Sequence, residues 1–206
     1  MKFVEFKNKV KDLPLFSSPQ IIANSGNSDA LKNQISLWKK QGLILPLKKG
    51  LYVLNENDRR ITPSREFIAN QLVFPSYISL EYALSFYTII PERVFQVTSV
   101  TSKKTQTFEN SFGVFSYRNI RNDLFFGFVS LEDENGMQFL IAEKEKALLD
   151  FLYLNLSHIK TYDPFFLKES YRMENLNELD DNLMLNYTES FRSKKLSRII
   201  KNLVKG

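Results

Sequence analysis

The part of the sequence that most constrains the fold is a helical pattern followed at once by two short apolar runs, at residues 27–54. In its first half, Leu31, Ile35 and Trp38 have the spacing of residues that share one face of a helix. Gly42 stands just beyond this pattern, where a glycine commonly ends a helix in the left-handed conformation. This half therefore predicts an amphipathic helix with an apolar inner face.

The second half of the stretch predicts a β-hairpin. Apolar runs occupy residues 43–47 and 51–54, and the residues between them are Lys48, Lys49 and Gly50. A short gap that contains glycine is typical of a hairpin turn. A helix followed directly by a hairpin with a basic turn is the order of elements in the second half of a winged helix-turn-helix, whose helix enters the major groove of DNA.

The candidate DNA-contacting residues lie on the outer face of the predicted helix, at the hairpin turn and in the polar linker beyond it. They are Lys32, Asn33, Ser36, Lys39, Lys40, Lys48, Lys49, Arg59 and Arg60. The basic residues would contact phosphate, with Lys48 and Lys49 projecting outward at the turn, whereas Asn33 and Ser36 can pair with base edges. The same pattern occurs in α+β domains whose lysines only face water, so it indicates DNA binding without establishing it.

The first 60 residues have the size of a minimal winged-helix domain. Apolar residues at near-helical spacing predict a first helix at residues 1–12. A serine-proline start signal predicts a short second helix at residues 19–24. We therefore expect a winged helix-turn-helix DNA-binding domain at residues 1–60, and a separate mixed α/β domain at residues 61–206.

The expected second domain has a β-rich middle and helices on either side of it. Helical patterns occupy residues 62–73, 79–87, 143–154 and 189–204, and strand patterns occupy residues 93–101, 112–117, 124–129 and 137–142. Short turns join the strands, so the sheet is expected to be mainly antiparallel. Leu148, Phe151 and Leu152 are expected to pack against it. The predicted fold class is α+β, with C-terminal helices after the sheet.

The net charge of +5 is unevenly distributed along the chain. Residues 1–60 hold eleven Lys and Arg against five Asp and Glu, residues 132–188 hold five against twelve, and residues 189–206 hold six against one. Basic segments therefore flank an acidic one. This asymmetry favours a polyanionic partner for the basic parts, although lysines scattered over solvated surfaces would give the same counts.

Motifs that carry chemistry are scarce in this sequence. It has no cysteine and one histidine, which excludes disulfide bonds and thiolate or histidine-rich metal sites. It shows no nucleophile motif and no phosphate-binding glycine loop, so we expect neither an enzyme nor a cofactor. The acidic residues at 132–134 are better explained by a solvated turn than by a metal site. Because no apolar run approaches the ~20 residues that span a bilayer and no signal-peptide core is present, we expect a cytoplasmic protein.

Three stretches together resemble the AbiEi antitoxin family of type IV toxin–antitoxin systems, a family associated with abortive infection and phage defence. LILPLKKGLYVL, at residues 43–54, is similar to the end of that family's winged helix. YISLEYALSFYTIIPE, at residues 77–92, is similar to its helical segment after the DNA-binding module. AEKEKALLDFLYL, at residues 142–154, is similar to its P-E-K-A-L-L-D helix. One departure is lysine at positions 48 and 49, where arginine is common, which weakens any inference of bidentate base recognition there.

The resemblance implies a repressor that binds double-stranded DNA at its own promoter. It also implies that the C-terminal domain opposes a nucleotidyltransferase-like toxin without forming a stable complex with it. Two alternatives stay open: a solitary winged-helix transcriptional regulator without a toxin, and a non-enzymatic interaction protein whose basic surface meets an acidic protein. A toxin reading frame beside the gene would separate the first two, and binding to the chain's own promoter would separate both from the third.

Overall fold

The N-terminal part of the chain forms helices and a three-stranded sheet. The computed structural model describes residues 2–18 and 28–205. The elements of this part are α1 (Phe3–Val10), β1 (Phe16–Ser17), α3 (Ser28–Lys40), β2 (Ile44–Lys48) and β3 (Leu51–Leu54). The strand order is β1-β3-β2, and both pairs are antiparallel. The predicted first helix, amphipathic helix and hairpin are confirmed, whereas the short helix expected at residues 19–24 lies outside the described residues.

The inner face of α3 packs on a cluster of aromatic rings. Trp38 stacks on Phe6 of α1 with ring centroids 4.7 Å apart, and Phe6 meets Phe16 of β1 edge-on at 5.4 Å. Leu31 and Ile35 are buried beside these rings, and only 5% of Trp38 is exposed. The helical phase predicted from residue spacing is therefore confirmed.

The middle of the chain forms a six-stranded sheet of order β6-β7-β5-β4-β9-β8. Its elements are α4 (Arg65–Leu72), β4 (Ser76–Ile78), α5 (Leu80–Phe86), β5 (Val97–Thr101), β6 (Gln106–Asn110), β7 (Gly113–Asn119), the 3₁₀ helix η1 (Asn122–Leu124), β8 (Phe128–Glu132) and β9 (Gln138–Ala142). The pairs β4–β5, β6–β7 and β8–β9 are antiparallel, but β4–β9 and β5–β7 are parallel. The sheet is therefore mixed. The parallel partners are not consecutive in the chain, since β6 comes between β5 and β7, and β5 to β8 come between β4 and β9.

Three details of this sheet differ from the sequence-based expectation. The edge strand β6 was not predicted, because its sequence QTFEN is mostly polar, and β4 was not predicted because it is only three residues long. The strand expected at residues 124–129 begins at Phe128. Gly127, with φ of 71°, separates it from η1.

The C-terminal part consists of packed helices: α6 (Lys144–Leu154), α7 (Phe165–Tyr171), the 3₁₀ helix η2 (Leu176–Glu178), α8 (Asp181–Phe191) and α9 (Lys194–Lys205). Leu148, Phe151 and Leu152 are buried, but α6 packs mainly on α5 and α8 and only slightly on β9. These three residues belong to the same apolar cluster as the buried residues of the six-stranded sheet, and α5 and α8 cover more of α6 than the sheet does. The single helix expected at residues 189–204 is wrong, because Arg192 adopts the left-handed conformation, with φ of 51°, between α8 and α9.

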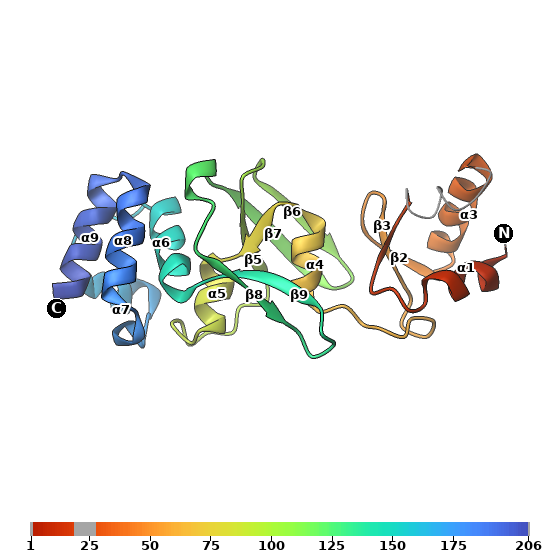
Figure 1. Cartoon of the computed structure of the whole chain (residues 1–206), viewed down its shortest axis with the longest axis horizontal. Helices are drawn as coiled ribbons and strands as arrows, with labels where there is room; N and C mark the ends of the chain where they lie inside the picture. The colour runs from red at the N-terminus through yellow and green to blue at the C-terminus, as the bar shows by residue number, and fades with distance from the viewer. Residues whose placement is uncertain (1, 19–27, 206) are drawn as a thin grey trace.

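The three parts lie in a row along the longest axis of the molecule (Figure 1). The hairpin of β2 and β3 stands between α3 and the six-stranded sheet, and it contributes to two apolar clusters. Ile44 and Leu54 belong to the N-terminal cluster, whereas Leu47, Leu51 and Val53 belong to the larger cluster of the rest of the chain. Since the hairpin is shared, the domain boundary at residue 60 stays a prediction. Among the described residues, no helix has both the length and the apolar character needed to cross a membrane.

Candidate nucleic-acid interface

The five polar residues predicted on the outer face of α3 are all exposed. They are Lys32, Asn33, Ser36, Lys39 and Lys40. The buried side chains of the same helix point into the aromatic cluster, so the helical period alone turns these five outward. The structure therefore brings together, on one face of one helix, the first five of the nine candidate residues.

The outer face of α3 is placed where a large ligand can reach it. The helix lies at one end of the molecule, with the hairpin between it and the six-stranded sheet (Figure 1). Lys39 and Lys40 occupy its last turn, where the helix dipole favours cations. The side chains of Asn33 and Ser36 can both donate and accept hydrogen bonds. The face thus combines positive charge with neutral groups capable of base recognition.

The turn of the hairpin directs Lys49 outward. Gly50 has φ of 82° in this turn, a conformation that glycine adopts without steric cost. Its carbonyl accepts a hydrogen bond from the backbone N–H of Ser18 at 2.9 Å, which attaches the turn to the end of β1. Lys49 is exposed, so its expected outward orientation is confirmed.

Lys48 is oriented differently from the expectation. Its ammonium group donates to the Leu72 carbonyl at 2.6 Å and to the Gln71 carbonyl at 3.4 Å. These carbonyls end α4, where unpaired acceptors and the helix dipole attract a cation. Burial lowers the pKa of Lys48, and the ammonium of Lys103 lowers it further. The expected outward projection of Lys48 is wrong, because α4 supplies acceptors that the hairpin sequence cannot reveal.

Arg59 and Arg60 are both engaged within the protein. The Arg59 guanidinium donates to the Thr62 hydroxyl at 3.1 Å and lies over the Phe112 ring, 5.5 Å from its centroid. Arg60 is exposed and forms an ion pair with Asp12 at 3.0 Å. Such an exposed pair is weak, so a phosphate could compete for Arg60. Arg59 instead attaches the linker to the β6–β7 hairpin.

Two lysines that the sequence did not single out lie near the hairpin. Lys103 and Lys104 are exposed in the loop between β5 and β6, and the charge of Lys103 acts on Lys48. The signal in the sequence is a Lys-Lys pair within the polar residues 101–107. Nothing local shows that this pair lies beside a hairpin more than 50 residues earlier in the chain, so only the tertiary structure finds it.

A buried polar network in the second half of the chain was also missed. Tyr77 and Ser79 donate to one carboxylate oxygen of Asp150 at 2.8 and 3.0 Å, and Lys146 donates to the other. All four side chains are fully buried. Burial lowers the pKa of Lys146 and raises the pKa of Asp150, and the opposite charge of each opposes this shift in the other. These hydrogen bonds connect α6 to β4 and to the start of α5 in the interior of the fold.

In the acidic turn before β9, Glu132 and Glu134 are exposed and Asp133 is half-buried. Oδ1 of Asp133 accepts hydrogen bonds from the backbone N–H groups of Asn135 and Met137, both at 2.9 Å, and so closes its own turn. Glu145 accepts a backbone hydrogen bond from Asp180 at 2.9 Å, which is a packing role. Within residues 2–18 and 28–205, no three His, Cys, Asp or Glu side chains are grouped so that they could hold a metal ion.

Comparison with known proteins does not place the chain in a family. No protein-family model matches the sequence, and no curated protein matches it either. A functional assignment therefore rests on the geometry of the chain itself and on the resemblance of its three stretches.

Proposed function

We propose that the chain is a non-catalytic transcriptional regulator whose N-terminal part is a winged helix-turn-helix that binds double-stranded DNA. The observation that carries this proposal is the outer face of α3. It exposes three lysines, one asparagine and one serine on a helix whose opposite face is buried. In this arrangement α3 is the recognition helix, and the β2–β3 hairpin is the wing.

The dimensions of α3 suit the major groove of B-form DNA. Its 13 residues correspond to a length of about 20 Å. The major groove is about 12 Å wide and admits one α-helix. The lysines would contact phosphates on the walls of the groove, and Asn33 and Ser36 would face base edges. Lys49 would add a phosphate contact from the wing, whereas Lys48 is held by α4.

The repressor and antitoxin roles rest on the resemblance. We infer that the chain represses its own operon and that its C-terminal half opposes a nucleotidyltransferase-like toxin without a stable complex. The two resembling stretches at residues 77–92 and 142–154 contribute all four side chains of the buried network around Asp150. The resemblance thus covers residues that hold the second half of the chain together.

A binding assay tests the DNA-binding proposal. Fluorescence anisotropy would measure the affinity of the full chain for its own promoter and for a random duplex of equal length. Lys39→Ala/Lys40→Ala should weaken binding to both duplexes. Lys160→Ala/Lys168→Ala is the matched control, because it removes the same charge from exposed positions in the acidic segment and should leave affinity unchanged. If the wild-type chain bound neither duplex, the DNA-binding proposal would fail. An interaction between the basic surface and an acidic protein would then be the favoured alternative.

A co-expression assay separates the two proposed roles. The chain would be produced together with a nucleotidyltransferase-like reading frame adjacent to its gene. We expect wild type and Lys39→Ala/Lys40→Ala to restore growth equally, while only wild type represses a promoter fusion. Loss of both activities in the variant would contradict the division of labour between the two halves. Failure of the wild-type chain to restore growth would instead favour a solitary regulator.

A further inference from the structure

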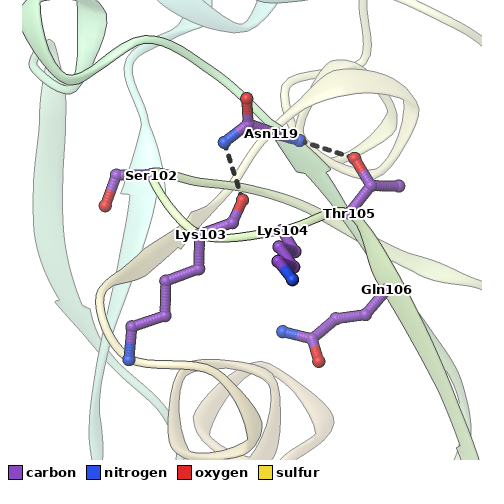
Figure 2. A pocket seen from close by; sticks show the side chains of 6 residues that line it. All are labelled: Ser102, Lys103, Lys104, Thr105, Gln106 and Asn119. Atoms are coloured by element: carbon purple, nitrogen blue, oxygen red, sulfur yellow. Dashed lines mark hydrogen bonds between the residues drawn. The ribbon is translucent and has the colours of Figure 1, made fainter.

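The loop between β5 and β6 has a backbone that is held in place while its two lysines extend into solvent. Asn119 donates from its side-chain amide to the Lys103 carbonyl at 2.7 Å, and its backbone N–H donates to the Thr105 hydroxyl at 3.1 Å (Figure 2). The backbone N–H of Lys103 in turn donates to the Thr101 hydroxyl at 3.1 Å. The loop is therefore a preformed turn, and ordering it for a ligand costs little conformational entropy.

The side chains of this loop are suited to an anion. Lys103 and Lys104 are exposed, and in the described part of the chain neither forms an ion pair or donates a side-chain hydrogen bond. They border an open hollow of about 750 Å³ that is also lined by Ser102 and Gln106. Figure 2 shows the side chains of Lys103 and Gln106 extending to the same side of the loop. Phosphate oxygens accept hydrogen bonds from ammonium, hydroxyl and amide groups, and the loop presents all three.

The loop lies close to the wing of the proposed winged helix. Lys48 of the wing binds the Leu72 carbonyl, and the Thr101 hydroxyl at the base of the loop donates to the Pro75 carbonyl at 2.6 Å. The Leu72 and Pro75 carbonyls are three residues apart, and three residues of extended chain span at most about 11 Å. The point where Lys48 is bound therefore lies near the point where the base of the loop is bound. The wing turn and the β5–β6 loop lie along the same long edge of the molecule, the upper one in Figure 1.

We propose that the β5–β6 loop is a second phosphate-binding site, in which Lys103 and Lys104 contact the backbone of the same DNA duplex that α3 and Lys49 bind. This inference rests on the proposed DNA binding and extends it to the second half of the chain. Each strand of B-form DNA presents a phosphate every 3.4 Å along the helix axis, so a duplex that passes the wing also presents phosphates to the neighbouring loop. The site positions the duplex and does not read its sequence, because ammonium groups are point charges.

The test is a salt titration of the full chain on its own promoter and on a random duplex of equal length. The slope of log affinity against log salt concentration is negative, and each phosphate contact that is lost makes it less steep by about 0.9. Lys103→Ala/Lys104→Ala should therefore make the slope less steep by about 1.8 and weaken both complexes about thirtyfold near 0.15 M salt. Lys160→Ala/Lys168→Ala should change neither quantity. Thermal unfolding of each variant should match wild type, since all four side chains are exposed.

The outcomes separate this inference from the proposal on which it rests. If wild type bound and Lys39→Ala/Lys40→Ala lost affinity, but Lys103→Ala/Lys104→Ala kept the wild-type slope, the loop would not be a DNA contact and only this inference would fall. If wild type bound no duplex, both would fall. A reduced slope in the loop variant together with an unchanged control supports the loop site.

Discussion

The outer face of α3 and the β2–β3 hairpin are the two proposed DNA-binding elements, and they are attached to the rest of the protein in different ways. The polar residues of α3 are exposed on a helix whose apolar inner face is buried. The hairpin instead places Leu47, Leu51 and Val53 in the core of the second half, and Lys48 binds the end of α4.

This difference separates residues that can change freely from residues that cannot. Substitutions on the outer face of α3 are expected to alter the proposed DNA binding while the core stays intact. Substitutions in the hairpin are expected also to affect how the N-terminal part is held against the six-stranded sheet. The side-chain amide of Asn110 donates to the Leu47 carbonyl at 3.2 Å, which adds to this attachment. We therefore expect α3 to carry the sequence preference of the proposed DNA binding, and the hairpin mainly to fix the position of α3.

The largest expected effect comes from the inner face of α3. Trp38→Ala should lower the free energy of unfolding by about 3–5 kcal/mol, because it removes a buried ring that stacks on Phe6. Leu37→Ala on the same helix is the control, since 51% of Leu37 is exposed and its removal should cost less than about 1 kcal/mol. Urea unfolding followed by circular dichroism measures both. Equal destabilisation by the two variants would contradict the inner and outer faces assigned here.

The next effect concerns base recognition by α3. Asn33→Ala should narrow the difference in affinity between the promoter and a random duplex by about 1–3 kcal/mol, if Asn33 forms a bidentate pair with a base. Stability should stay within about 0.5 kcal/mol of wild type, since the side chain is exposed. Competition binding with the two duplexes measures the preference. An unchanged preference would remove Asn33 from the base-reading residues.

A smaller effect distinguishes the two neighbouring lysines of the hairpin. Lys48→Met should lower the free energy of unfolding by about 1 kcal/mol, because the Leu72 carbonyl loses a charged donor in a half-buried position. Lys49→Met should leave stability within about 0.5 kcal/mol, because the side chain is exposed. The salt dependence of DNA binding should show the opposite order, with Lys49→Met reducing it more than Lys48→Met does. A reversed pair of results would show that Lys48 is the residue that meets DNA.

What could be predicted from the sequence depended on how local each feature is. The phase of α3 follows from three apolar residues within two turns, and the hairpin follows from one glycine between apolar runs. The orientation of Lys48 could not be predicted, because its acceptor belongs to Leu72, far along the chain. The buried ion pair of Lys146 and Asp150 in α6 could not be predicted either, because charged residues of a helix are ordinarily expected at the protein surface.

The most direct test of the central claim is lysine acetylation of the full chain with and without its promoter duplex, followed by mass spectrometry. Lys39 and Lys40 on α3 are exposed and should react readily in the free protein, as should the control residues Lys160 and Lys168. We predict that the duplex protects Lys39 and Lys40 severalfold and leaves Lys160 and Lys168 unchanged. If Lys39 and Lys40 stayed as reactive in the complex as in the free protein, α3 would not be the DNA-binding helix.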